Sequence, residues 1–232
     1  MKLRVVLVEP MYDGNVGSIA RLMKNLGFYK LVLVNPCPIE DFGYAMASHA
    51  RDVMENAQVV DSLEEALEGT NLVVGSSGVL ILNTDEHLRV PGLKPEELAF
   101  KLQKTKGEVA LLLGREDNGL TRDELRICDM IVTIPTSQEY PIMNISHAAA
   151  LILYQLSQVE PGEIALANGD DMDRLYDHLK SELAGVQYPS HKLDKTMLMM
   201  KRIFGRAQLT DREVQTLHGV IRSLRWQPRS QK

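Results

Sequence analysis

Residues 107–157 read GEVALLLGREDNGLTRDELRICDMIVTIPTSQEYPIMNISHAAALILYQLS, and this stretch decides the fold. Within it, two short apolar runs at residues 109–113 and 130–134 each end in a polar loop before a helical pattern begins. Fully apolar strands of this length are typical of parallel sheets that are covered on both faces. Open sheets of that kind hold their ligands in the loops at the carboxyl ends of the strands. We therefore expect a ligand site in the loops at residues 114–119 and 135–141.

The rest of the first 160 residues repeats this alternation of strand and helix. Apolar runs predict strands near residues 3–8, 31–34, 59–60 and 72–74, and helical periodicity predicts helices near residues 16–26, 44–56, 96–104 and 144–158. Residues 79–95 have weak periodicity and two prolines, which predicts an irregular loop. The alternation indicates an α/β fold with a doubly wound, mostly parallel sheet.

A polar break follows the sheet region and divides the chain. We assign a first domain to residues 1–160, a linker to residues 161–171, and a small helical C-terminal domain to residues 172–232. Helical patterns in this last part cover residues 172–183 and 191–207, and a third begins near residue 210. The third carries one narrow apolar stripe formed by Val214, Leu217, Ile221 and Leu224.

The composition is that of an ordinary globular protein and excludes several classes. Of the 232 residues, 44% are hydrophobic and 25% are charged, and no apolar run approaches the ~20 residues of a membrane span. Cys37 and Cys128 lack the spacing of a zinc site or a disulfide framework. We expect a cytoplasmic protein that has no membrane partner.

Charge is distributed unevenly along the chain. Residues 192–232 contain ten Lys and Arg residues against three Asp and Glu residues, a net charge of +7, which leaves −12 on the remaining 191 residues. A basic segment on an acidic body is typical of a surface that binds a polyanion. The same count also describes a solvated helical face, and the sequence alone does not decide between the two.

The familiar phosphate-binding and catalytic motifs do not fit. The glycines at 114 and 119 have Walker A spacing, but Leu120 stands where the lysine belongs, and the first strand is not followed by GxGxxG. Ser146 and His147 are adjacent in a helical pattern and point about 100° apart, which disfavours a nucleophile–base pair. His49 and His87 have no partner at metal-ligand spacing, so no metal site is expected. The glycines and Glu116 are explained equally well by turn chemistry.

Three sequence blocks together resemble the motifs of a known enzyme family. They are NVGSIAR at residues 15–21, GREDNGL at residues 114–120, and IP at residues 134–135 followed by MNISHA at residues 143–148. In this order, over about 160 residues, they resemble the SPOUT class of RNA 2′-O-ribose methyltransferases, of the SpoU or TrmH type. The chain length and the helical extension look most like the TrmJ branch of that family.

The resemblance implies a particular fold and cofactor. The fold is a parallel sheet whose C-terminal part is threaded into a deep trefoil knot, a topology nearly absent from proteins. The methyl donor is S-adenosylmethionine, with no metal required and with the adenine against Ile134 and Met143. By motif match, the expected cofactor-binding residues are Ser76, Ser77, Gly78, Gly114, Gly119, Ile134, Pro141, Ile142 and Met143.

The resemblance also assigns catalytic roles. Arg21 matches the family's catalytic arginine, and we expect its guanidinium to donate to the developing alkoxide, because that group seldom gives up its proton. Asn15 and Glu116 are expected to hold Arg21 and its loop in place. Asn144 and Ser146 begin the last helix of the expected knot and suit either capping or substrate contact.

The implied substrate is tRNA, methylated on a ribose of the anticodon loop at nucleotide 32. The implied assembly is a homodimer whose active sites are shared between the subunits, with the C-terminal helices adding dimer contacts and a basic surface for tRNA. Two alternatives stay open at this point. One is an rRNA 2′-O-ribose methyltransferase, and the other is a non-catalytic RNA-binding scaffold with the same fold.

Overall fold

The main sheet is parallel and places the predicted loops at one edge. A computed structural model of the chain describes residues 1–78 and 92–224. In these residues one sheet has the strand order β3-β2-β1-β7-β4-β8-β5, and every pairing in it is parallel. Its strands are β1 (Lys2–Val8), β2 (Lys30–Val34), β3 (Gln58–Val60), β4 (Leu72–Ser76), β5 (Gly92–Leu93), β7 (Glu108–Leu113) and β8 (Met130–Val132). The predicted α/β class with a mostly parallel sheet is confirmed.

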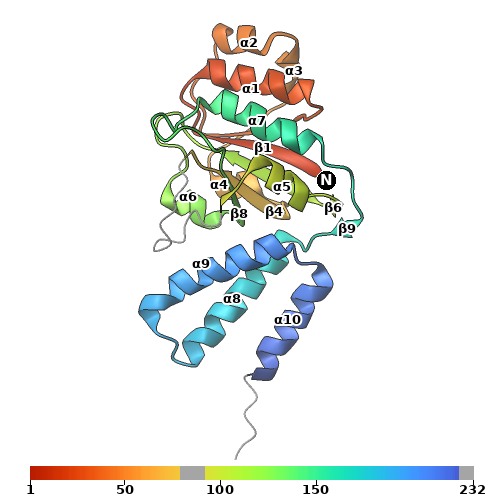
Figure 1. Cartoon of the computed structure of the whole chain (residues 1–232), viewed down its shortest axis with the longest axis vertical. Coiled ribbons are helices and arrows are strands. Elements are labelled where there is room, and N and C mark those ends of the chain that lie inside the picture. The colour runs from red at the N-terminus through yellow and green to blue at the C-terminus, as the bar shows by residue number, and fades with distance from the viewer. Residues whose placement is uncertain (79–91, 225–232) are drawn as a thin grey trace, which may run out of the picture.

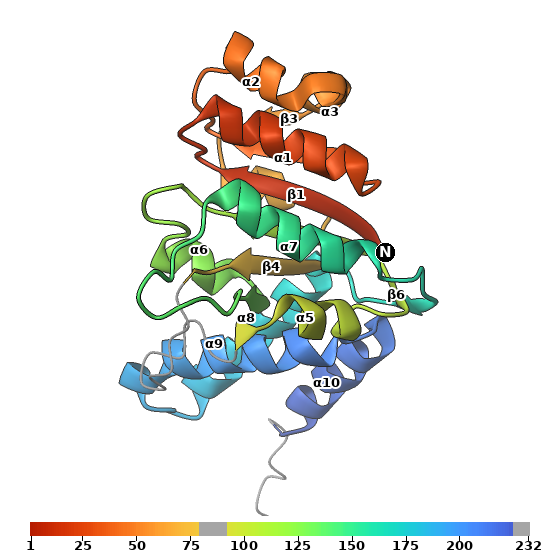
Figure 2. The same ribbon diagram turned by 45° about the horizontal axis from the view of Figure 1, so that its top comes forward.

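The strands are apolar throughout because helices cover both faces of the sheet (Figures 1 and 2). Successive residues of β1 show this, since Val5 and Leu7 belong to one core cluster while Val6 and Val8 belong to the other. The first face carries α1 (Asp13–Asn25), α2 (Asp41–Ala47), α3 (Arg51–Glu55), α5 (Pro95–Lys101) and α7 (Ile145–Ser157). The second face carries α4 (Leu63–Leu67) and α6 (Arg122–Ile127).

The register of the sheet brings three loops together. Leu7 pairs with Leu113, Gly75 pairs with Leu112, and Ser76 pairs with Val132. Because these strands are parallel and end at similar heights, the loops that follow β4, β7 and β8 leave the sheet side by side. The two loops expected to form the site therefore meet, and the end of β4 joins them.

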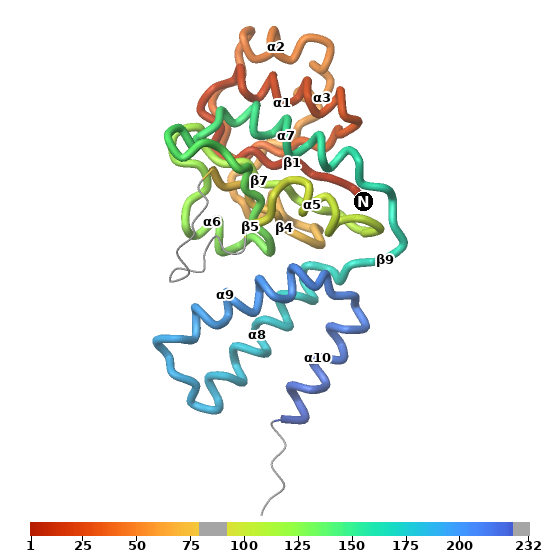
Figure 3. Tube along the Cα trace, in the orientation of Figure 1, coloured from red at the N-terminus to blue at the C-terminus, as the bar shows by residue number. Residues whose placement is uncertain are grey.

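Three helices form the C-terminal region, as predicted. They are α8 (Gly169–Gly185), α9 (Ser190–Ala207) and α10 (Asp211–Leu224), and they enclose a small core around Leu175 and Val214. Figure 3 follows the chain from the end of α7 through β9 (Ile164–Ala165) into these helices. There β9 pairs with β6 (Thr105–Lys106) in a two-stranded parallel ladder that the sequence did not reveal.

Two local predictions need correction. The single helix expected near residues 44–56 is broken into α2, the short 3-10 helix η1 (Ser48–Ala50) and α3, and Ser48 at the break has a left-handed φ of 52°. Of the loop expected at residues 79–95, residues 79–91 lie outside the described part, while residues 92–93 form strand β5 and pair with β8. Across residues 1–78 and 92–224, no helix has the length and apolar character needed to cross a membrane.

Candidate active site

A cavity of about 310 Å³ lies where the loops after β4, β7 and β8 meet. Its walls combine the apolar ends of the strands with the polar loop that begins at Gly114. The nine residues expected to bind a cofactor all line this cavity: Ser76, Ser77, Gly78, Gly114, Gly119, Ile134, Pro141, Ile142 and Met143. Three separate stretches of the sequence thus contribute to one pocket.

The loop after β7 turns back on itself and requires glycine at both ends. Gly119 has a left-handed φ of 66°, and a Cβ added to Gly114 would lie 2.2 Å from the carbonyl carbon of Gly119. The turn is closed by backbone hydrogen bonds in both directions between Arg115 and Gly119, at 3.2 Å and 2.9 Å. These glycines therefore serve a close backbone approach that shapes the cavity wall, beyond ordinary turn chemistry.

The loop after β8 forms the opposite wall. The Thr136 hydroxyl donates a 2.8 Å hydrogen bond to the Pro141 carbonyl oxygen, which closes residues 136–141 into a compact loop. A Cβ added to Gly78 would lie 3.1 Å from Cδ1 of Ile142, so the end of β4 and this loop are in close contact. Ile142 itself is 50% exposed, which places it at the mouth of the cavity.

A hydrogen-bond network joins four of the five predicted catalytic residues. Asn15 Nδ2 donates a 2.9 Å bond to Glu116, and Asn144 Nδ2 donates a 3.3 Å bond to Asn15 Oδ1. Asn144 Oδ1 in turn accepts from both the backbone N–H and the hydroxyl of Ser146, at 2.8 Å and 2.7 Å. Asn144 is therefore the N-cap of α7, and capping is the role that the geometry gives it.

Glu116 also anchors the start of the first helix. Its carboxylate accepts hydrogen bonds from the backbone N–H groups of Met11 and Tyr12, at 2.9 Å and 3.3 Å. The negative charge sits beside the N-terminus of α1, where the helix dipole favours an anion. One carboxylate of the cavity loop thus fixes both the backbone entry and the first turn of α1.

Arg115 holds the same loop from its other side. Its guanidinium donates to Glu9 at 2.8 Å and, through two parallel bonds of 3.0 Å, to Glu124 at the start of α6. Glu9 has a left-handed φ of 46°, an unusual backbone conformation for a residue other than glycine. Burial raises the pKa of Glu124, but the hydrogen bonds from Arg115 and Thr121 and the charge of Arg115 together outweigh it, so the pKa is lowered. The pairing fixes the loop between the end of β1 and α6.

Arg21 stands apart from this network. Its side chain is exposed, and it forms no hydrogen bond or ion pair with the residues that the structure describes. Arg21 lies six residues beyond Asn15 on α1, which is about 9 Å along the helix and on a different side of it. Within a single chain, the predicted catalytic arginine is therefore separated from the residues expected to hold it.

Sequence reasoning missed the residues of α6 and α7 that back the cavity. Leu125 of α6, and Ala148 and Ile152 of α7, contribute to its apolar wall. The spacing of Ile145, Ala148 and Ile152 along one helical face was the available signal. In residues 1–78 and 92–224, no three His, Cys, Asp or Glu side chains gather where they could hold a metal ion.

The comparisons with known proteins agree with this arrangement. A family model described as the SpoU rRNA Methylase family matches residues 2–154, which contain the sheet, the cavity and the network. The chain belongs to the SpoU methylase family. A second model, described as the C-terminal domain of the tRNA methyltransferase TrmJ, matches residues 170–232 of this SpoU methylase.

Relatives of this SpoU methylase match it over nearly its whole length. A Methanocaldococcus jannaschii protein named tRNA (cytidine-2′-O-)-methyltransferase TrmJ is 37% identical and spans 93% of this chain and 96% of its own. A Pectobacterium atrosepticum protein named tRNA (cytidine/uridine-2′-O-)-methyltransferase TrmJ is 39% identical over 96% of both chains. The crystal structure of TrmJ from Z. mobilis ZM4 has 25% identity, a TM-score of 0.75, and coverage of 97% of this chain and 100% of that one.

Proposed function

We propose that this chain is an S-adenosylmethionine-dependent tRNA 2′-O-ribose methyltransferase that modifies cytidine or uridine in the anticodon loop, at nucleotide 32. The observation that carries the proposal is that the three family motifs, which are far apart in the sequence, lie next to one another in the structure. Their residues form the wall of a single cavity and the hydrogen-bond network that runs from Glu116 through Asn15 to Asn144. The relatives named as tRNA 2′-O-methyltransferases, which align from end to end, support the choice of tRNA.

The lining of the cavity suits the cofactor. Ile134, Met143 and Val132 give an apolar wall for a flat aromatic base, and the loop backbone offers N–H and C=O groups for its edge. A Cβ added to Gly119 would meet nothing within 4 Å among the described residues, so a ligand can approach the loop backbone closely at that point. Glu116 brings a carboxylate to the cavity, which is favourable for a ligand that carries a positive sulfonium.

Methyl transfer requires the protein mainly to align the ribose hydroxyl with the methyl group. S-adenosylmethionine supplies a methyl group that is already activated, so the chain needs to position a ribose hydroxyl and stabilise the alkoxide as it develops. Arg21 is suited to the second task, because its free guanidinium can donate to the ribose oxygen and to a neighbouring phosphate. Asn15, Glu116 and Asn144 position the helix that carries Arg21, and Ser146 completes the cap of α7.

In a homodimer with shared active sites, Arg21 of one subunit would lie beside the cofactor cavity of the other. Within one chain Arg21 lies on a different side of α1 from Asn15, so we assign it to the cavity of a second copy. The surface beside it is suited to self-association, because α7 exposes Leu151 and Tyr154 at 45% and 56%, and the entry to α1 exposes Tyr12 at 61%. Helices α1 and α7 pack against each other, so these side chains lie on neighbouring elements of one face.

The proposed fold includes the deep trefoil knot. The chain is proposed to divide into a catalytic domain at residues 1–160, a linker at residues 161–171 and a helical domain at residues 172–232. The strand order supports the knot. Strand β7 lies between β1 and β4, and the chain then passes through α6 on the second face of the sheet to reach β8 on the other side of β4. From β8 it returns to the first face, where α7 packs beside α1. The helical region is proposed to bind tRNA and to extend the dimer contact.

The deciding experiment is methyl transfer from labelled S-adenosylmethionine to unmodified tRNA, followed by mapping of the modified ribose. The proposal predicts one 2′-O-methyl group at nucleotide 32 of tRNAs that carry C or U there. Transfer to ribosomal RNA in place of tRNA would assign the chain to the rRNA alternative. Cofactor binding without transfer to either RNA would assign it to a non-catalytic scaffold.

A further inference from the structure

Arg202 of α9 reaches into the catalytic domain and binds the C-terminal end of α6. Its guanidinium donates to the carbonyl oxygens of Cys128 and Leu125, at 2.5 Å and 2.8 Å, and the residue is only 4% exposed. Carbonyls at the end of a helix have no partner within the helix, and a cation there also complements the helix dipole. A buried arginine of the helical domain thus completes a helix of the catalytic domain.

Two neighbours of Arg202 strengthen this junction. A Cβ added to Gly205 would lie 2.6 Å from the backbone oxygen of Asp129, so α9 meets the start of β8 with no side chain between them. Lys201 Nζ lies 3.8 Å from the Asp129 carboxylate, whose other oxygen accepts a 2.8 Å hydrogen bond from the backbone N–H of Val73. Residues 201–205 therefore form one docking point on the α6–β8 connection.

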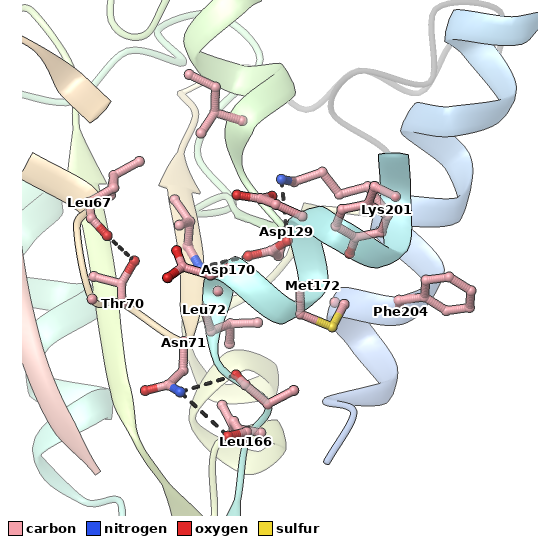
Figure 4. Close-up of a pocket in the computed structure, with 18 of the residues that line it drawn as sticks. Leu67, Thr70, Asn71, Leu72, Asp129, Leu166, Asp170, Met172, Lys201 and Phe204 are labelled. Atoms are coloured by element: carbon pink, nitrogen blue, oxygen red, sulfur yellow. Dashed lines mark hydrogen bonds and ion pairs between the residues drawn. The ribbon is translucent and has the colours of Figure 1, made fainter. Parts of the chain in front are cut away.

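Beside this docking point the two domains are separated by a cavity of about 740 Å³ (Figure 4). Its far side is closed where Asn71 donates to the carbonyl oxygens of Leu166 and Ala167 in the linker, at 3.4 Å and 3.1 Å. Figure 4 shows Lys201 pointing toward Asp129 on the near side. Because this cavity lies in the domain interface, α9 meets the catalytic domain at the docking point, which comprises the C-terminal end of α6 and the connection to β8.

The opposite end of α6 is hydrogen-bonded to the candidate cofactor loop. Glu124, in the first turn of α6, holds Arg115 by two parallel hydrogen bonds, and Arg115 lies in the loop at residues 114–119. Leu125 lines the 310 Å³ cavity, and its carbonyl oxygen accepts from Arg202. One residue of α6 thus borders the candidate cofactor site and is bonded to the helical domain.

We propose that Arg202 is a positioning residue that couples the helical domain to the cofactor site through α6. Helix α6 has six residues, too few to hold its own shape in water, so its position depends on the groups bound at its two ends. When Arg202 fixes the C-terminal end of α6, Glu124 stays where it can accept the hydrogen bonds of Arg115. The loop at residues 114–119 then maintains the shape of the cavity. Movement of α9, for example when the helical domain binds RNA, is then transmitted to cofactor affinity.

The proposal rests on the proposed function only in taking the 310 Å³ cavity as the S-adenosylmethionine site. The test is calorimetric titration of the full chain with S-adenosylmethionine in the absence of RNA. Arg202→Met is expected to weaken binding about ten-fold at unchanged stoichiometry, and Arg202→Lys, which retains a charged donor, about three-fold. Arg206→Met is the matched control, because Arg206 lies one turn further along α9 and makes no hydrogen bond or ion pair with the described residues. Its binding is expected to equal that of the wild type.

Stoichiometry separates positioning from folding, since a partly unfolded sample lowers the number of sites but not the affinity of those that remain. A double variant adds a second readout, because Arg202→Met and Glu124→Gln act on the same helix and should weaken binding by less than the product of their separate effects. Wild-type affinity in both Arg202 variants would overturn the proposal. Absence of binding by the wild type would overturn the assignment of the cavity instead.

Discussion

Asn15 donates its side-chain amide hydrogen to Glu116 across 2.9 Å, so the first helix and the loop after β7 share one carboxylate. The same carboxylate accepts from the backbone N–H groups of Met11 and Tyr12. The proposed catalytic helix is thereby held by a residue whose loop also lines the proposed cofactor cavity. Under the proposed dimer, a change in this contact is expected to shift Arg21 relative to the cofactor in the partner's cavity, as well as to alter the local stability.

Glu116→Gln should therefore reduce turnover far more than stability. The amide replaces one acceptor oxygen with a donor, which faces the donors of Asn15 and of the backbone and repels them. A displacement of about 1 Å at the start of α1 is enough to lower kcat by about 100-fold. Methyl transfer to tRNA at saturating substrate measures this. Glu96→Gln on α5 is the matched control, because Glu96 is exposed and makes no hydrogen bond or ion pair with the described residues. Equal losses in the two variants would contradict the positioning role.

Arg21→Ala should abolish most of the activity without affecting the fold. The side chain is exposed and makes no hydrogen bond or ion pair with the described residues, so the free energy of unfolding should change by no more than about 0.5 kcal/mol. Removal of a donor to a developing oxyanion lowers kcat by roughly 100- to 1,000-fold. Single-turnover methyl transfer measures the loss of activity, and chemical denaturation measures the free energy of unfolding. Full activity of the variant would remove Arg21 from the catalytic site.

Two glycines of the cavity should respond differently to alanine. At Gly114 the new Cβ would lie 2.2 Å from backbone atoms that cannot move aside, so Gly114→Ala should cost more than about 3 kcal/mol of stability or prevent folding. At Gly78, among residues 1–78 and 92–224, it would meet the flexible end of Ile142 alone, at 3.1 Å, so Gly78→Ala should fold and bind the cofactor a few-fold more weakly. Thermal unfolding and cofactor titration distinguish the two variants. A larger loss of stability in Gly78→Ala than in Gly114→Ala would show that the loop at residues 114–119 is not closed by the contact between Gly114 and Gly119.

The sequence was sufficient for the strands and the motif loops because their signals are local. Uninterrupted apolar runs identified β1, β7 and β8, and the glycine and proline positions marked the loops between them. The meeting of Asn15 with Asn144 is not local, since 129 residues separate them and only the strand order brings them together. The break at Ser48 was also missed, because helical periodicity continues across it and only the left-handed backbone reveals it.

The basic segment shows a different limit. The charge count treated every Lys and Arg after residue 191 as part of one polyanion-binding or solvated surface. Arg202 instead lies buried against helix carbonyls, and Lys201 faces the carboxylate of Asp129. Charge is a property of the sequence, whereas burial depends on which surface the helix meets, so a count of basic residues overstates the surface open to RNA.

The two cysteines should differ sharply in reactivity. Cys128 lies fully buried beneath the docked α9, and burial raises the pKa of its thiol to about 12. Burial and the nearby carboxylates of Asp13 and Glu116 raise the pKa of Cys37 to a smaller extent, and that side chain remains partly accessible. One thiol per chain should therefore react with a maleimide in the folded protein, and two after denaturation. The Cys37→Ser variant provides the control and should show none before unfolding; rapid labelling of Cys128 in that variant would mean that α9 is undocked in solution.

The helical domain should lose stability in mildly acidic solution because of two facing histidines. The Nδ1 atoms of His178 on α8 and His218 on α10 lie 2.9 Å apart, so one ring must donate and the other must accept, and the two cannot both be protonated there. Burial, followed by the charge on His178 and that on Arg222, lowers the pKa of His218 below its value in the unfolded chain, while Asp171 opposes the shift. Glu182 lies 4.0 Å from the other side of the His178 ring, and Arg174 adds a further positive charge near His218.

The unfolded chain consequently binds a proton at His218 at a higher pH than the folded chain does. The stability from this site is fully present above the unfolded pKa of about 6.5 and is lost as the pH falls from there through the lower, folded pKa. Thermal unfolding between pH 7.5 and 5 should show a falling midpoint. His218→Gln should flatten that dependence, because glutamine can still donate to or accept from His178 but carries no charge. His191→Gln, at an exposed position on α9, is the control and should keep the wild-type slope, so equal slopes in the wild type and His218→Gln would place the acid sensitivity elsewhere.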